Sequence, residues 1–230
     1  MSGPRRWGDP TAGIPGRRLF VALPLPDDAA AAVTEVVEEV RASGLPEGAR
    51  DVRWVRLDGL HLTLRFLGPT LEPRVAPTAA AVVAAAAAAG PIELELGGAG
   101  TFPPGGRPRT IWIGVQRGAE AVDALSHAVS AALEPAGWPI DDRPFRPHLT
   151  LARSDGIAVG PLVASRLVAA MAQRRIVFEA DRLGLYESVT GGGPARYVPV
   201  MVASLAARAG DGPDVYHRTH PEQNRARTQE

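Results

Sequence analysis

The chain has 230 residues, of which 45% are hydrophobic, and its acidic and basic side chains balance at 25 each. This composition is sufficient for a core of ordinary size, and the neutral net charge excludes a general electrostatic attraction to nucleic acid or membranes. The lack of cysteine excludes disulfides, thiolate nucleophiles and cysteine-ligated metal clusters, and it fits the reducing cytoplasm in which we expect the protein.

Composition divides the chain into three predicted parts. Residues 1–17 contain basic residues, glycine and proline but no hydrophobic segment of the secretory type, and we expect a disordered leader. Residues 18–207 contain the periodic segments and are expected to form one two-lobed domain. The sequence then becomes polar and aperiodic, so residues 208–230 are predicted to be a disordered tail.

Apolar runs and helical segments alternate along the domain, and their order predicts an α+β fold. Alanine-rich runs that end at glycine are typical of helices, and paired apolar runs around turn residues are typical of hairpins. The predicted elements are a strand at 18–26, a helix from Asp27 to Gly44, a hairpin at 54–67 with its turn at Asp58 and Gly59, a helix at 72–89, a hairpin at 91–115, a helix at 119–136, a strand at 148–153, a helix at 161–173 and two strands at 174–189 and 195–206.

The tetrapeptide His-Leu-Thr-Leu occurs twice, at 61–64 and at 148–151, each time on a predicted strand. Side chains alternate between the two faces of a strand, so the histidine and threonine of each copy share one face while the leucines point into the core. The chain contains only five histidines, and two in matching apolar contexts indicate a functional site. A third His-x-Thr sequence, at 217–219, lies in the polar tail and is interpreted as coincidence, and His127 as an ordinary helix residue.

Two imidazoles that meet across one pocket supply both groups that an in-line displacement at phosphorus needs. One deprotonates the attacking water and the other protonates the leaving oxygen, since a pKa of about 6.5 suits either role at neutral pH. We therefore expect His61 and His148 to be catalytic, and Thr63 and Thr150 to bond the phosphoryl oxygens. Metal binding is the main alternative for paired histidines, but apart from Asp58 the motifs lack nearby carboxylates, so neither a metal nor a cofactor is expected.

An arginine is expected to stabilise the charge on the phosphoryl oxygens. Arg153 follows the second motif, but regular alternation turns its side chain away from that of Thr150. It therefore reaches the site only if the strand ends or bulges near Ala152. Arg143 and Arg146, just before the motif, are the alternatives.

The segments HLTLRFLG and RPFRPHLTLAR, with RLFVALPLP before them and RLGLYES after them, resemble the two-histidine phosphoesterase superfamily. Within it they are most similar to the bacterial RNA 2',3'-cyclic phosphodiesterases of the 2'-5' RNA ligase family, from about Arg18 to Ala203. The resemblance implies a bilobal fold in which two antiparallel sheets face a central cleft, with helices on the outer faces and one motif on each wall. It also favours Arg153 as the arginine of the site.

The activity that the resemblance implies is hydrolysis of an RNA terminal 2',3'-cyclic phosphate to a 2'-phosphate, together with a reversible 2'-5' RNA ligase activity that needs no ATP. Expected partners are RNA ends or small cyclic nucleotides and no membrane, and we expect a monomer. Phe20, Tyr186 and Tyr197 are candidates for stacking on a base, although phenylalanine on an apolar strand is usually core. His148 is assigned as the base and His61 as the acid, which depends on substrate orientation.

Two other functions are left open by the sequence. One is a nucleotide-binding or RNA-binding module that uses the same cleft without turnover. The other is the same chemistry on a different ester, such as another cyclic phosphate or a 2'-5' linked oligonucleotide.

Overall fold

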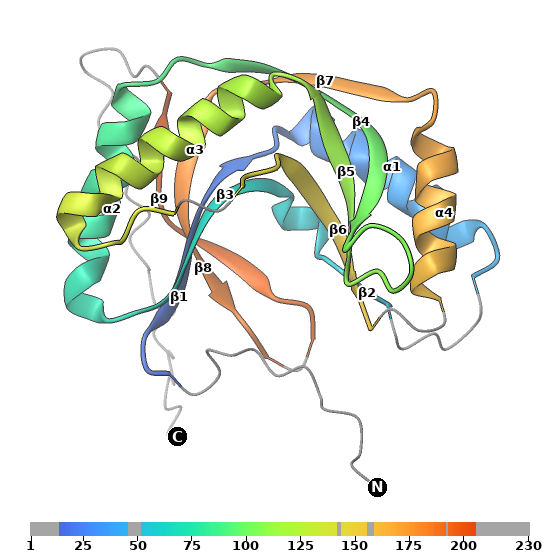
Figure 1. Cartoon of the computed structure of the whole chain (residues 1–230), viewed down its shortest axis with the longest axis horizontal. Helices are drawn as coiled ribbons and strands as arrows, with labels where there is room; N and C mark the ends of the chain where they lie inside the picture. Colours follow the sequence, from blue (N-terminus) through green and yellow to red (C-terminus); the bar gives the residue numbers. More distant parts are fainter. Residues whose placement is uncertain (1–13, 46–51, 142–143, 156–158, 192, 206–230) are drawn as a thin grey trace, which may run out of the picture.

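The computed structural model describes residues 14–45, 52–141, 144–155, 159–191 and 193–205, which form a curled antiparallel sheet with helices on its outer side (Figure 1). The predicted α+β fold is confirmed. Residues 1–13 of the predicted leader, the whole predicted tail at 208–230 and the third His-x-Thr sequence lie outside the described residues.

The strands are β1 (Arg17–Pro24), β2 (Val52–Trp54), β3 (His61–Thr70), β4 (Ile92–Phe102), β5 (Thr110–Arg117), β6 (His148–Ser154), β7 (Arg175–Ala180), β8 (Arg182–Val189) and β9 (Arg196–Ser204). The helices are α1 (Asp27–Ala42), α2 (Glu72–Ala87), α3 (Ala119–Leu133) and α4 (Gly160–Met171), with short 3-10 helices at Leu57–Gly59 and Glu134–Ala136.

The strand order divides the sheet into two lobes. The first lobe is β3-β1-β8-β9, and the second is β6-β5-β4-β7 with β2 also beside β6. The motif strands β3 and β6 are neighbours at the centre, where Leu62 pairs with Leu149 and joins the lobes into one sheet. Each lobe begins at its motif strand and adds three further strands on the side away from the other lobe. An approximate twofold axis between β3 and β6 therefore relates the two lobes.

Helices cover the outer face of each lobe. Helices α2 and α3 pack on the first lobe, and α1 and α4 pack on the second (Figure 1). The leucines of both motifs are buried beneath these helices, as alternation along the strands predicts. Among the residues described, no helix combines the length and the hydrophobicity needed to cross a membrane.

The hairpin predicted at 54–67 is wrong. Strand β2 pairs with β6, Trp54 opposite Ala152, and the Val55 N–H donates to the Leu151 carbonyl at 2.9 Å. Since β2 and β3 are both antiparallel to β6, they follow each other along one edge of it in the same direction. The 3-10 helix between them changes the path of the chain without reversing it. Asp58 and Gly59 correctly indicated that the chain leaves the strand conformation between β2 and β3. They could not indicate that β2 pairs with β6, which lies far along the sequence.

The single strand predicted at 174–189 is two strands in different lobes. Strand β7 pairs with β4 in the second lobe, and β8 pairs with β1 and β9 in the first. The chain crosses at Asp181, whose carbonyl accepts the Leu205 N–H at 2.7 Å. Apolar residues continue on both sides of this crossing with no glycine or proline to mark it, so the local pattern did not reveal it.

Candidate active site

The two motifs meet where the lobes join. Their central leucines are opposite each other, and continuing this antiparallel register sets His61 opposite Thr150 and Thr63 opposite His148. The histidines thus occupy diagonal corners of a four-residue group, with Cα atoms about 8 Å apart in a regular sheet. An anion held in the middle of this group meets one imidazole from each side.

A bulge in β6 turns Arg153 toward the motif residues. Thr150 and Ala152 pair with successive residues of β5, so Leu151 is an extra residue in β6. Leu151 and Ala152 are both buried as a result, and the exposed Arg153 returns to the face of Thr150. The condition that the sequence imposed on Arg153 is therefore met.

Arg153 is held in place by Thr110, since its Nη1 donates to Thr110 Oγ1 at 3.0 Å. It forms no ion pair with a carboxylate within the described part of the chain, so its charge remains available to an anion. Of the alternatives, Arg146 lies with its guanidinium 4.9 Å from the centre of the Trp112 ring. Arg143 lies outside the described residues.

Phe66 is an exposed residue on the face of the motif histidines that sequence reasoning missed. Regular alternation from His61 would bury it, but Leu64 is an extra residue in β3 where that strand pairs with β1. This bulge matches the one at Leu151, and Phe66 is 59% exposed. The second motif could have indicated this position. If the bulge that turns Arg153 toward the motif residues is repeated in the first motif, the equivalent residue there is Phe66.

Both histidines are oriented in the same way by the backbone. Nδ1 of His61 donates to the Gly59 carbonyl at 2.7 Å, and Nδ1 of His148 donates to the Arg146 carbonyl at 2.7 Å. A carbonyl oxygen only accepts, so Nδ1 carries the hydrogen and Nε2 is the basic atom of each neutral ring. Each imidazole therefore has Nε2 available for proton transfer.

Aromatic rings fix both imidazoles laterally. The His61 ring lies 4.8 Å from that of Phe20 and 4.7 Å, edge to face, from that of Tyr197. His148 meets Phe102 edge to face at 4.9 Å. Packing on these rings restricts rotation of the histidine side chains and keeps Nε2 in one place.

Two of the three predicted stacking residues remain accessible. Phe20 is only 1% exposed and is covered by His61 and by the Tyr186 ring at 5.6 Å, so it supports His61 and has no face left for a base. Tyr186 and Tyr197 are partly exposed. Tyr186 lies flat against Gly184, where an added Cβ would come within 2.4 Å of its ring.

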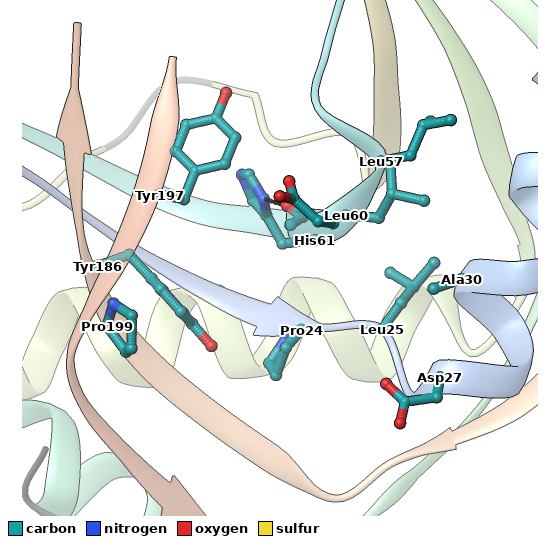
Figure 2. A pocket seen from close by; sticks show the side chains of 12 residues that line it. Pro24, Leu25, Asp27, Ala30, Leu57, Leu60, His61, Tyr186, Tyr197 and Pro199 are labelled. Carbon is teal, nitrogen blue, oxygen red and sulfur yellow. Dashed lines mark hydrogen bonds between the residues drawn. The ribbon is translucent and has the colours of Figure 1, made fainter. Parts of the chain in front are cut away.

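A pocket of about 370 Å³ lies beside His61 (Figure 2). Figure 2 shows Tyr186 and Tyr197 on one side of it and Asp27, at the start of α1, on the other. The charged side chains among its lining residues are the carboxylates of Asp27 and Asp58, and Asp58 is paired with the Arg56 guanidinium. The lining residues are Pro24, Leu25, Asp27, Ala30, Leu57, Asp58, Gly59, Leu60, His61, Tyr186, Tyr197 and Pro199.

The hydroxyls of Thr63 and Thr150 have no hydrogen-bond partner within the described ranges. By contrast, Thr34, Thr70 and Thr78 each donate to a backbone carbonyl at 2.7 to 3.1 Å. Unused hydroxyls at both motif positions are therefore available to bond an incoming ligand.

The environment lowers the pKa of both histidines. Burial lowers the pKa of His61, and the bond to the Gly59 carbonyl opposes this effect only in part. Burial also lowers the pKa of His148. The bond to the Arg146 carbonyl opposes this effect, and the positive charges of Arg153 and Arg146 make smaller contributions that lower the pKa. Both imidazoles are therefore mainly neutral at pH 7.

The strand register and the bulge in β6 thus set two histidines, two threonines and one guanidinium on the same face of neighbouring strands. That combination suits acid–base displacement at a tetrahedral phosphorus. Across the described segments, no three histidine, aspartate or glutamate side chains come together as a site for a metal ion.

Known proteins share this sequence and fold. The family model for the 2'-5' RNA ligase superfamily matches residues 25–192. The RNA 2',3'-cyclic phosphodiesterase of Geobacillus stearothermophilus is 37% identical over 134 residues, which cover 58% of this chain but only 41% of that protein. A crystal structure from Thermus thermophilus matches with a TM-score of 0.62 and 28% identity, over 82% of this chain and 98% of that one.

The crystal structure of Escherichia coli LigT complexed with 3'-AMP matches with a TM-score of 0.60 and 26% identity, over 83% of this chain and 99% of that one. The family-model match covers well over half of the 230 residues and includes both motifs. The chain therefore belongs to the 2'-5' RNA ligase superfamily.

Proposed function

We propose that this protein is a metal-independent phosphodiesterase that opens an RNA terminal 2',3'-cyclic phosphate to a 2'-phosphate. The observation that supports the proposal is the pairing of Leu62 with Leu149. Its register, continued by one residue on each side, sets His61 and His148 at diagonal corners, with threonine hydroxyls that have no partner in the described structure at the other two. The Geobacillus relative is named an RNA 2',3'-cyclic phosphodiesterase, and LigT has been crystallised with 3'-AMP.

In the proposed reaction His148 acts as the base and His61 as the acid. Nε2 of His148 removes a proton from water while the water oxygen bonds to phosphorus. The bond from phosphorus to O3' breaks, His61 protonates O3', and the phosphate stays on O2'. The charges of Arg153 and Arg146 support this assignment, because they favour the neutral form of His148.

Charge develops on the non-bridging oxygens as water attacks. Thr63 and Thr150 donate hydrogen bonds to these oxygens, and Arg153 adds a guanidinium whose charge is not paired with a carboxylate in the described structure. With a 5'-hydroxyl in place of water as the nucleophile, the same groups open the ring in the same way and join two RNA ends through a 2'-5' linkage.

The pH optimum of kcat/KM for a cyclic nucleotide is expected to lie below about 6.5, the usual pKa of histidine. The rate needs one neutral and one protonated imidazole, so it peaks midway between two pKa values that are both lowered in the free protein. The bound anion raises both values, so the optimum of kcat should lie at higher pH. Rate profiles from pH 4 to 9, on the order of ten points, separate the two; a kcat/KM optimum above pH 7 contradicts this account.

Product analysis tests the proposed function directly. Incubation with adenosine 2',3'-cyclic phosphate, and with an oligoribonucleotide ending in a cyclic phosphate, should yield the 2'-phosphate, which chromatography separates from the 3'-phosphate. EDTA should leave the rate unchanged. A 3'-phosphate product would require the opposite leaving oxygen, and inhibition by EDTA would indicate a metal-dependent reaction.

The alternatives give different results in the same experiment. A binding module would retain the cyclic nucleotide without forming product, and an enzyme for another ester would turn over a different member of a panel of cyclic phosphates. We propose RNA ends as the natural substrate, and a monomer in the cytoplasm as the state in which they are processed.

A further inference from the structure

Arg53 lies directly beside Arg153 on the face of the sheet that contains the motif histidines. The two residues are opposite each other in the antiparallel pair β2 and β6, and opposite residues of such a pair point to the same face, with their Cα atoms about 5 Å apart. The pairing continues across β5 and β4, so one row of the second lobe consists of Arg53, Arg153, Thr110 and Phe102.

Contacts at the two ends of this row identify its face. Phe102 meets the His148 ring edge to face at 4.9 Å, so the row lies on the side of the histidines. Trp54, next to Arg53, points the other way, since the Arg41 guanidinium of α1 lies 4.9 Å from the centre of its ring. Arg53 therefore extends into solvent on the side of the histidines, with 72% of its side chain exposed.

The charge of Arg53 is only weakly neutralised. Its Nη2 lies 3.9 Å from Asp155 Oδ1, which is longer than a hydrogen bond, and the Asp155 side chain is itself 56% exposed. Water and salt weaken an exposed ion pair of this kind. The neighbouring Arg153 is bonded to the neutral hydroxyl of Thr110. In the described part of the chain the two guanidinium groups thus share one carboxylate, and a net positive charge remains for an anion.

The proposed reaction directs a second phosphate of the substrate toward this charge. Water beside His148 attacks in line with the departing O3', so C3' of the ribose lies on the side of His61. C3' is bonded to C4', which leads to C5' and its phosphate, whereas the base is attached across the ring at C1'. Strands β2 and β3 follow each other along one edge of β6, and Arg53 lies on this edge beyond His61. The 5' side of the terminal nucleotide is therefore directed toward Arg53.

We propose that Arg53 binds the phosphodiester that joins the terminal nucleotide to the rest of the RNA. It is a binding residue and not a catalytic one, and the inference rests on the proposed function for the position of the cyclic phosphate. A guanidinium donates paired hydrogen bonds to phosphate oxygens, and such a contact adds affinity whatever the base sequence. The protein should therefore prefer an RNA end to a nucleoside cyclic phosphate, which lacks the second phosphate.

Affinity measurements test the proposal without requiring turnover. Calorimetry is carried out with adenosine 2'-phosphate, with the adenosine dinucleotide that ends in a 2'-phosphate, and with the same dinucleotide joined by an uncharged methylphosphonate. Arg53→Gln is expected to weaken binding of the charged dinucleotide roughly tenfold, the scale of one charge-assisted contact. It should change binding of the other two ligands by less than about twofold, because neither has a charged phosphodiester.

Arg117→Gln is the matched control, because it removes the same charge from the other end of β5, where Arg117 is bonded to Glu93 at 2.8 Å. It should change none of the three affinities. Equal losses for the mononucleotide and the charged dinucleotide in Arg53→Gln would assign Arg53 to the terminal phosphate. A loss of the same size in Arg117→Gln would indicate a general attraction by charge. Either result overturns the proposal, as does full affinity of Arg53→Gln for the charged dinucleotide.

Salt dependence provides a second readout. For an oligoribonucleotide that ends in a 2'-phosphate, the slope of log Kd against log salt concentration should be shallower by about 0.7 in Arg53→Gln, the change expected for one lost phosphate contact on a single strand. An unchanged slope contradicts the contact.

Asp155→Asn should have the opposite effect to Arg53→Gln. Loss of the carboxylate beside Arg53 is expected to strengthen binding of the charged dinucleotide roughly twofold, because the phosphodiester no longer competes with an exposed ion pair. The gain should disappear when Asp155→Asn is combined with Arg53→Gln. A gain that persists in the double variant shows that Asp155 acts on another group and contradicts the proposal.

Failure of this inference can be distinguished from failure of the proposed function. If the ligands show the expected pattern of affinities but no cyclic phosphate is turned over, the proposed function fails while the phosphodiester contact stands. If the dinucleotide 2',3'-cyclic phosphate is turned over with the same KM by the wild-type protein and by Arg53→Gln, the function stands and the inference fails.

Discussion

Alanine in place of His61 or His148 is expected to lower kcat for a 2',3'-cyclic phosphate by at least ~10²-fold, because each variant lacks one of the two proton-transfer groups. The double variant should be far less impaired than the product of the two single effects, since the histidines act as a unit. Initial rates with adenosine 2',3'-cyclic phosphate measure both effects. Added imidazole should restore part of the activity in the single variants.

His127→Ala is the control for these variants. His127 lies on α3 with 64% of its side chain exposed, and Nε2 lies 3.7 Å from Asp123 Oδ2. Its replacement should leave the rate unchanged. Thermal unfolding must accompany the rates, because His61 is packed among aromatic rings and its loss leaves a gap. A folded single variant with near-normal turnover contradicts two-histidine catalysis.

Arg153→Ala is expected to produce the second large effect, a fall in kcat of about 10²-fold or more. The guanidinium stabilises charge that develops on the phosphoryl oxygens, so kcat should fall more than KM rises. Arg153→Lys keeps the charge but loses the planar fork of donors, and should recover only part of the rate. Steady-state kinetics on a cyclic nucleotide separate the two parameters.

Arg146 and Arg117 provide the comparisons for that result. Arg146 stacks on Trp112 beside the site, so Arg146→Ala should cost clearly less than Arg153→Ala. Arg117 is half-exposed and bonded to Glu93 at 2.8 Å, and Arg117→Ala should have no effect. If Arg146→Ala proves the more damaging change, the phosphate contact belongs to Arg146 and the resemblance to the family misassigned it.

The chemistry of the site could be predicted from local pattern. Strand alternation alone separates His61 and Thr63 from their leucines, and the structure confirms that separation at both copies of the motif. The bilobal fold was implied by the resemblance to the family, and the strand order shows two lobes. The first prediction succeeded because alternation depends only on the geometry of a single strand.

Pairing between distant strands could not be predicted in the same way. No local pattern indicates that β2 lies beside β6, or that the chain changes lobes at Asp181, because hydrogen bonding between strands uses backbone groups common to all residues. The same reason explains why Phe20 was considered for base stacking: its burial comes from His61 and Tyr186, which lie on other strands.

The sequence by itself determined which side chains supply the chemistry: two histidines, two threonines and an arginine conditional on a bulge. Only the tertiary structure decided that Leu64 and Leu151 are the extra residues, and hence that Phe66 and Arg153 face the cleft. The physical reason is that a bulge is a mismatch between two paired strands. It changes the face of every residue beyond it, and one strand read alone contains no record of its partner.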